Sequence, residues 1–306
     1  MEKIKLGSSE LLVPRIAVGC MRIPQRGEEN TARLIDTALE RGFNFFDHAD
    51  VYGGGGGSER MFAKAYGMTP AKREKIILQT KCGLTHGIYD ASKTRILEAV
   101  DGSLQRLNTE YLDVLLLHRP DALMDPEEVA EAFDLLYSQG KVRHFGVSNQ
   151  NPMQIRLLQK YVKQPLIVNQ LQFSIMHSGM VDAGIHVNMS DAASVDHDGS
   201  VLDFCRLHDI TIQPWSPFQY GFFEGVFVGN EKFPELNATL DRIAERYNVT
   251  AITIALAWIL RHPAKMMPVT GTTEPERFRQ CLDAAEITLT RDEWYEIYKS
   301  AGNRLP

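Results

Sequence analysis

Short apolar runs alternate with longer stretches of mixed apolar and polar residues along nearly the whole chain. The apolar runs occupy residues 15–19, 43–47, 76–81, 113–118, 142–149, 166–174, 210–218 and 266–271. Runs of this length without strict alternation are typical of strands that are buried on both faces of a parallel sheet. The pattern therefore predicts eight strands, each followed by another element.

The stretches between these runs carry the i, i+3, i+4, i+7 spacing of an amphipathic helix. In one of them, Ile96, Val100, Leu104 and Leu107 recur on a single face. Corresponding segments cover residues 31–42, 58–67, 129–140, 152–162, 200–208, 234–262 and 275–286. We expect a helix in each of them.

Helix-terminating residues agree with this periodicity. Asp125, Pro126 and Glu128 form a pattern of N-cap, first-turn proline and capping-box acid. Gly42 and Gly140 stand where a helix should end before the next strand. These residues support the boundaries that the periodicity predicts.

Eight strand–helix units in series indicate an α/β protein with a parallel sheet. The strand beginnings recur about every 36 residues, and a (β/α)8 barrel of eight such units needs about 250 residues. No linker rich in Pro, Gly or Ser divides the chain. We therefore expect residues 1–306 to form a single (β/α)8 TIM barrel domain, with an additional C-terminal helix that opens at Thr290 and Glu293.

Composition narrows the class of protein. The 306 residues are 44% hydrophobic and 24% charged, which excludes a disordered or collagen-like chain. The net charge of −6 argues against a nucleic-acid-binding protein, because such proteins usually carry an excess of basic charge.

The sequence has no signal-peptide pattern at its start, and its most apolar stretch, residues 251–260, is too short to span a membrane. Cys20, Cys82, Cys205 and Cys281 are widely separated, so neither a disulfide framework nor a zinc site is indicated. We expect a reduced, cytoplasmic protein that holds no metal and acts on a small molecule.

Polar residues stand at the ends of consecutive predicted strands. Asp47, Lys81 and His118 end the second, third and fourth strands, and Tyr52 follows Asp47 by five residues. The active site of an α/β barrel lies at the carboxyl ends of its strands, so these four side chains can converge.

Together the four residues suit proton transfer to a carbonyl oxygen. A free tyrosine, with a pKa of about 10, is a poor proton donor at neutral pH. A neighbouring Lys81 ammonium is expected to lower that pKa, and Asp47 can serve as the counter-ion of the buried lysine. His118 can donate a hydrogen bond to the carbonyl oxygen.

Several segments resemble the aldo-keto reductase family, and the longest are most similar to its compact bacterial branch. The segments are FFDHADVYGG (45–54), LQTKCG (78–83), LLLHRPD (115–121), VRHFGVSN (142–149) and QPWSPF (213–218). The resemblance implies a (β/α)8 barrel that transfers hydride between NAD(P)H and an aldehyde or ketone. It implies Tyr52 as general acid, Lys81 and Asp47 as its tuning pair, and His118 as the residue that positions the carbonyl.

The resemblance also implies a cofactor site. Ser148, Asn149 and Gln170 would hold the nicotinamide amide, and Trp215 would lie against the nicotinamide ring. The remaining expected contacts are Met21, Ser216, Pro217, Phe218, Gly271, Thr272, Thr273, Arg277, Gln280 and Cys281. Arg277 matches a position that pairs with the 2′-phosphate, which favours NADPH over NADH. A monomer is common among compact members of the family.

Departures from the family pattern occur at three places. His48 stands where the family commonly has a small hydroxyl residue after the catalytic Asp. The family often carries Glu-Asn where this sequence has Gln280-Cys281, at the positions expected near the adenine. Residues 175–200 match no general family motif, and we expect them to lie on the active-site side, where they could shape the substrate pocket. The glycine run 53–57 completes neither a P-loop nor a dinucleotide fingerprint, so we interpret it as a flexible loop.

Two alternative functions stay open. A catalytically slow, nicotinamide-binding regulatory protein would resemble potassium-channel β-subunits, which keep the same four residues. A different barrel chemistry could use Lys81 to form a Schiff base.

Overall fold

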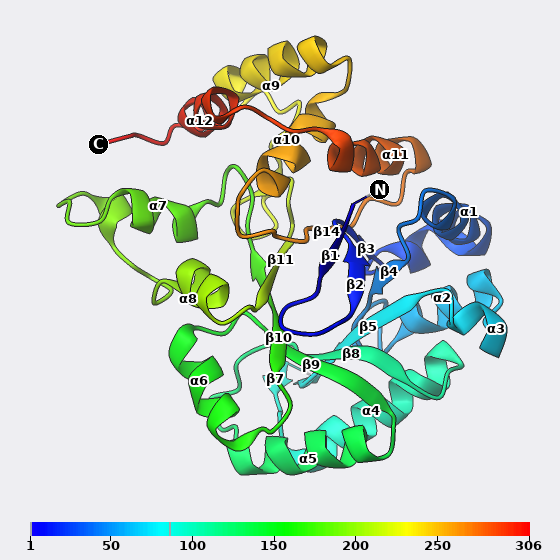
Figure 1. Ribbon diagram of the computed structural model, residues 1–306. Helices are drawn as coiled ribbons and strands as arrows, with labels where there is room; N and C mark the ends of the chain where they lie inside the picture. The colour runs from blue at the N-terminus through cyan, green and yellow to red at the C-terminus, as the bar shows by residue number, and fades with distance from the viewer. Residues whose placement is uncertain (1, 86) are drawn as a thin grey trace.

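The computed structural model describes residues 2–85 and 87–306, and at its centre eight parallel strands curve into a barrel (Figure 1). The strands are β3 (Ala17–Gly19), β4 (Phe45–Asp47), β5 (Ile77–Cys82), β8 (Leu112–Leu117), β9 (Val142–Ser148), β10 (Leu166–Gln172), β11 (Thr211–Trp215) and β14 (Val269–Thr270). Their order is β11-β10-β9-β8-β5-β4-β3-β14. The backbone N–H of Met267 donates to the Ile212 carbonyl oxygen at 3.0 Å, which brings the two edges of the sheet together. The predicted barrel is confirmed.

Helices surround the strands. They are α1 (Gly27–Glu40), α2 (Gly57–Tyr66), α3 (Pro70–Arg73), α4 (Lys93–Leu107), α5 (Pro126–Ser138), α6 (Pro152–Tyr161), α7 (Gly179–Ile185), α8 (Val201–Leu207), α9 (Pro234–Tyr247), α10 (Ala251–Leu260), α11 (Pro275–Asp283) and α12 (Arg291–Ser300). Each predicted helical segment overlaps at least one of them. In α4 the predicted apolar face is the buried face.

The N-cap residues are only partly as predicted. Asp125 accepts a hydrogen bond from the backbone N–H of Glu127 and caps α5, as expected. The prediction that Glu128 completes a capping box is wrong, because its carboxylate accepts from the backbone N–H of Lys93 at the start of α4. Thr290 and Glu293 do form a reciprocal capping box at α12.

The segment 234–262, predicted as one helical region, is two helices that meet at 90°. The break follows from Asn248, which ends α9 in the left-handed conformation with φ 53°, and from Thr250, whose side chain caps α10. Within residues 2–85 and 87–306 no single helix has the length and apolar character of a membrane span, and α9 with α10 meets that criterion only as this bent pair.

An N-terminal hairpin, which the sequence pattern did not predict, packs against the barrel interior. Strands β1 (Lys3–Lys5) and β2 (Leu12–Pro14) pair antiparallel. Leu6 and Val13 are completely buried in a cluster that includes Ile167 and Met267. Between the strands, Gly7 has φ +56°, and a Cβ there would lie 2.3 Å from the Ile167 carbonyl oxygen, so only glycine fits this close approach.

Residues 175–200 form α7 and a short 3-10 helix (Ala192–Ser194), and they lie against the C-terminal segment. The hydroxyl of Tyr298 in α12 donates to Asp182 at 2.8 Å. The His186 ring lies between two acceptors, with Nδ1 2.8 Å from the Asp191 carboxylate and Nε2 2.9 Å from the Arg304 carbonyl oxygen. Both contacts require the doubly protonated ring, because a neutral imidazole has only one N–H.

Candidate functional site

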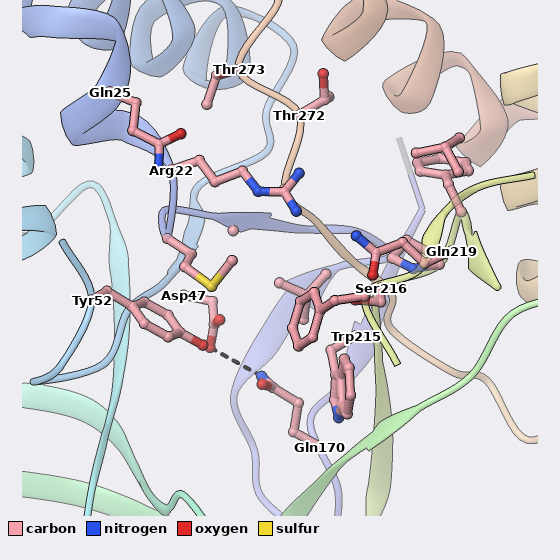
Figure 2. A pocket seen from close by; sticks show the side chains of 18 of the residues that line it. Arg22, Gln25, Asp47, Tyr52, Gln170, Trp215, Ser216, Gln219, Thr272 and Thr273 are labelled. Atoms are coloured by element: carbon pink, nitrogen blue, oxygen red, sulfur yellow. Dashed lines mark hydrogen bonds between the residues drawn. The ribbon is translucent and has the colours of Figure 1, made fainter. Parts of the chain in front are cut away.

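A cavity of about 510 Å³ opens at the carboxyl ends of the barrel strands. The sequence-predicted residues in its wall are Met21, Asp47, Tyr52, His118, Ser148, Asn149, Gln170, Trp215, Ser216, Pro217, Phe218, Gly271, Thr272, Thr273 and Arg277. Figure 2 shows Tyr52, Asp47, Gln170 and Trp215 at one end of the cavity. This volume lies within the range of about 300–1,000 Å³ that is usual for ligand sites.

Lys81 lies beneath the cavity rather than in its wall. It is completely buried, and its ammonium donates to both oxygens of Asp47 at 2.8 Å each and to the His48 carbonyl oxygen at 2.7 Å. Burial lowers the pKa of Lys81, but Asp47 and then Tyr52 outweigh that effect, so its pKa is raised above the ordinary value. The lysine is therefore a permanent buried cation.

This environment disfavours a Schiff base at Lys81. A Schiff base needs a neutral amine that a carbonyl compound can reach. Here the amine is protonated, fully enclosed and already committed to Asp47 and a backbone carbonyl.

Tyr52 connects the buried pair to the cavity. Its hydroxyl is 3.4 Å from the Lys81 ammonium, and its ring lies 4.9 Å from that ammonium. The residues after it, Gly53 to Gly56, all have positive φ, and α2 follows. The glycines thus let the chain turn sharply from Tyr52 into the helix.

The Lys81 ammonium acts to lower the pKa of Tyr52, as expected, but the net pKa of Tyr52 is raised. Burial raises the pKa of Tyr52, the Lys81 ammonium opposes that change, and the Asp47 carboxylate adds to it, so that the pKa lies above its ordinary value. The expectation fails because burial disfavours the charged phenolate more strongly than the Lys81 ammonium favours it, and the Asp47 carboxylate acts in the same direction as burial. The phenol is therefore fully protonated at neutral pH.

His118 faces Tyr52 edge-on, with 5.7 Å between the ring centroids. Burial, followed by the charges of Lys81 and Arg119, lowers the pKa of His118 to about 3, so that the ring is neutral. Its Nδ1 is enclosed without a hydrogen-bond partner among the described residues. Nε2 is therefore the ring nitrogen available to a bound molecule.

Two buried glutamines that the sequence did not indicate, Gln79 and Gln213, belong to the site. Gln79 donates to Asp47 at 2.7 Å, and Gln170 donates to the same Asp47 oxygen at 3.0 Å. Gln213 accepts from both glutamines, at 2.7 Å and 3.0 Å. Gln79 and Gln213 lie on strands β5 and β11, and a polar residue within an apolar run was the signal that could have identified them.

Hydrogen bonds between loops hold Asn149 and Trp215 in place. The indole Nε1 of Trp215 donates to Asn149 Oδ1 at 3.1 Å, and Asn149 Nδ2 donates to the Ser148 hydroxyl at 2.8 Å. Ser148 in turn donates to the Gln170 carbonyl oxygen at 2.8 Å. Because Gln170 commits its amide nitrogen to Asp47 and Gln213, its Oε1 is the atom left to accept from a ligand.

The opposite end of the cavity is cationic. Figure 2 shows Thr272 and Thr273 there, with Arg22 reaching between the two ends. Arg26 donates to the Thr273 hydroxyl at 2.9 Å and pairs with Glu274 at 2.7 Å, which ties the loop after β3 to the loop after β14.

Within the described chain, Arg22 and Arg277 have no ion-pair or hydrogen-bond partner for their side chains. Both line the cavity, and Arg277 is exposed in the first turn of α11. Unpaired guanidinium groups at a helix N-terminus are suited to phosphate. Arg22 was not predicted, although its position three residues after a strand end was a usable signal.

Two predicted cofactor residues lie elsewhere. Cys281 is completely buried in the hydrophobic core, and Gln280 lies outside the cavity wall, where its carbonyl oxygen accepts from Thr253. Thr253 belongs to α10, so the last turn of α11 contacts α10 through the Gln280 carbonyl oxygen.

Residues 175–200 also contribute nothing to the wall, because that segment packs against the C-terminal residues instead. Among residues 2–85 and 87–306, no group of three or more His, Cys, Asp or Glu side chains is placed to hold a metal ion.

Comparisons with known proteins agree with this geometry. Residues 15–301 match the model of the aldo/keto reductase family. The chain is 34% identical to the "Uncharacterized oxidoreductase YcsN" of Bacillus subtilis, covering 97% of each chain. It is also 34% identical to a "6-dehydroglucose reductase" of Agrobacterium fabrum, covering 98% of each. The crystal structure of the thermostable aldo-keto reductase Tm1743 in complex with the inhibitor epalrestat superposes with a TM-score of 0.78 at 26% identity, covering 98% of this chain and 100% of that one.

Proposed function

Because the chain belongs to the aldo/keto reductase family, we propose that it reduces an aldehyde or ketone with NADPH, and that Tyr52 is the general acid. The observation that carries the proposal is the contact of Tyr52 with the buried Lys81–Asp47 pair at the wall of the cavity. The same proposal treats residues 1–306 as one domain and as a monomer, since one chain supplies all the residues of the site.

The nicotinamide cofactor, when bound, supplies the hydride. The residues of this chain donate the proton and orient the carbonyl group. Tyr52 is protonated at rest because its pKa is raised, and it can give its proton to a carbonyl oxygen on which negative charge develops. His118, held neutral, offers Nε2–H to the same oxygen.

Lys81 stabilises the phenolate that Tyr52 becomes. Its ammonium lies within 3.4 Å of the phenol oxygen, and Asp47 keeps it charged. A charge held in a buried site stabilises a developing anion more strongly than the same charge in water. The Gln79–Gln170–Gln213 network fixes the Asp47 carboxylate and so fixes the lysine.

The cavity residues fit a dinucleotide phosphate. Arg22 and Arg277 are unpaired cations in its wall, and the Gln170 Oε1 is free to accept from a carboxamide. Arg277 would hold a 2′-phosphate, and this is the reason to propose NADPH rather than NADH.

The test is NADPH oxidation with a panel of aldehydes, ketones and 6-dehydroglucose, comparing the wild type with Tyr52→Phe. We expect kcat to fall by about 10²- to 10⁴-fold, because the mutant lacks the proton donor, while the Kd for NADPH stays unchanged. Tyr137→Phe, at an exposed position on α5, is the matched control and should retain full activity.

Two outcomes would contradict the proposal. Full activity of Tyr52→Phe would remove Tyr52 from the acid role. Tight NADPH binding without turnover in the wild type would favour a regulatory, nicotinamide-binding protein instead.

A further inference from the structure

One arginine in the catalytic half of the cavity has no partner. Arg119 directly follows His118, lines the cavity and is half-buried. Its side chain forms no hydrogen bond or ion pair with any residue that the structure describes. Its guanidinium lies 5.6 Å from the ring centroid of Trp215, a cation–π contact that holds it against the cavity wall.

The acid next to this arginine in the sequence and the acids that line the cavity have other partners. Asp121, two residues away, accepts from the backbone N–H of Ala91 at 2.9 Å and from that of Leu123 at 2.8 Å. Asp47 is paired with Lys81. Glu274, which lines the opposite end of the cavity, is paired with Arg26 at 2.7 Å. Arg119 therefore presents an uncompensated positive charge to whatever enters the cavity.

Arg119 lies at the end of the cavity where the reaction would occur. Its charge lowers the pKa of His118, after the larger effects of burial and Lys81, and it also acts on Tyr52. Coulomb interactions weaken with distance, so the guanidinium is near both groups. Thr272 and Thr273, at the proposed phosphate end, lie on the opposite side of the cavity from Tyr52 and Trp215 in Figure 2.

We infer that Arg119 anchors an anionic group of the substrate, so that the enzyme prefers carbonyl compounds that also carry a carboxylate, sulfonate or phosphate. This inference rests on the reductase function proposed above. The carbonyl oxygen would lie at Tyr52 and His118, and the anion would lie at Arg119. Val51 and Leu84, which also line the cavity, provide an apolar surface for the carbon chain of such a substrate.

The physical basis is the planar fork of guanidinium, which binds carboxylate and phosphate oxygens in pairs. Charge-assisted hydrogen bonds are stronger than neutral ones, and partial burial reduces their screening by solvent. A neutral substrate would leave Arg119 without a partner. The site would therefore favour anionic substrates and also discriminate against neutral ones.

A competing role is that Arg119 only adjusts the acidity of Tyr52 and His118. That role would affect all substrates equally and would shift the pH profile of kcat. The anchoring role would affect only the anionic substrates. The two roles are therefore separable by experiment.

The experiment compares 2-, 3- and 4-carboxybenzaldehyde with their methyl esters as substrates of wild type, Arg119→Gln and Arg119→Lys. We expect wild type to prefer at least one acid over its ester. Arg119→Gln should lower kcat/KM for that acid by about 10- to 100-fold and for its ester by less than roughly threefold. Arg119→Lys should retain part of the preference because it keeps the charge but loses the fork.

Arg277→Gln is the matched control. It should weaken NADPH binding and lower turnover of acid and ester by the same factor, whereas Arg119→Gln should leave the Kd for NADPH unchanged. Equal losses on acid and ester in Arg119→Gln, together with a shifted pH profile, would overturn the anchoring role. A wild type that prefers none of the acids over its ester would also overturn the anchoring role.

A binding measurement decides the inference even if no substrate is turned over. Calorimetry with 4-methylbenzoate and its neutral amide, in the presence of NADP⁺, reports on Arg119 without chemistry. Tighter binding of the benzoate, lost in Arg119→Gln, would support the anchor and leave only the reductase proposal in question. Equal binding of benzoate and amide to wild type would overturn the anchor.

Discussion

At the scale of single residues, the site is a set of opposed charges in which burial decides the protonation states. Burial raises the pKa of Tyr52 by more than the Lys81 ammonium lowers it, and Asp47, which pairs with Lys81, adds to the effect of burial. His118, beside Lys81 and Arg119, is held as a neutral donor. Each of these states follows from distances of a few ångströms that the linear sequence does not contain.

His118 should remain neutral well into the acid range. Its pKa of about 3 in the folded protein compares with about 6.5 for an unperturbed histidine. Because the unfolded chain binds more protons between these values, the stability contribution of His118 is present above pH 6.5 and is lost as the pH falls toward 3. NMR of the labelled imidazole should show no titration of this ring between pH 8 and pH 5. A midpoint near 6.5 would contradict the neutral-donor role.

At the scale of elements, loops that follow strands position the site, and hydrogen bonds between loops fix it. Arg26 joins the loop after β3 to the loop after β14, and Trp215 joins β11 to the loop after β9 through Asn149. The segment 175–200 has a different role, because its partners are in α12 and in the C-terminal residues. His186 is the centre of that second contact.

Replacing His186 with Gln should destabilise the protein more at pH 5.5 than at pH 8.5. The hydrogen bond to Asp191, and then the Arg304 carbonyl, raise the pKa of His186 above its ordinary value. For a histidine with a raised folded pKa, the stabilisation is fully present below the unfolded pKa of about 6.5 and is lost as the pH rises through the folded pKa. The difference in Tm between wild type and His186→Gln measures the effect at each pH. His197→Gln, at an exposed position of the same segment, is the control. A Tm difference that is independent of pH would show that the imidazolium is not what holds the C-terminal residues.

At the scale of the whole molecule, the cavity gathers residues from strands at both ends of the chain. Met21 and Arg277 are more than 250 positions apart in the sequence and line the same cavity. Residues from β3, β4, β8, β9, β10, β11 and β14, or from the loops after them, all contribute. A ligand bound there contacts most of the barrel at once, so it binds the folded chain and not the unfolded one.

NADPH should therefore raise the Tm of the protein. At a concentration of 100 times Kd, such a ligand adds about 2.7 kcal/mol, which corresponds to a shift of about 4 °C for a chain of this size. At equal concentration NADH should produce a smaller shift, and Arg277→Gln should remove the difference between the two cofactors. Equal shifts with NADH and NADPH in wild type would contradict the proposed 2′-phosphate contact of Arg277.

The sequence alone determined the strand–helix alternation and the residues that end each strand. Both are local properties, because the period of apolar residues depends on backbone geometry and a barrel places all strand ends at one rim. For this reason the sequence alone assigns Asp47, Tyr52 and His118 to one wall, with Lys81 beside them. The bend between α9 and α10 was not predicted, because an apolar helical pattern continues through the break.

Only the tertiary structure decided which polar groups are paired. The raised pKa of Tyr52, the Gln79–Gln170–Gln213 network and the burial of Cys281 depend on contacts between residues distant in sequence. Arg119 is another example. The sequence shows it in the motif LLLHRPD, but only the structure shows that it has no hydrogen-bond or ion-pair partner among the described residues. Electrostatic effects depend on distance and burial in space, and for that reason periodicity and motifs could locate the site but not set its charges.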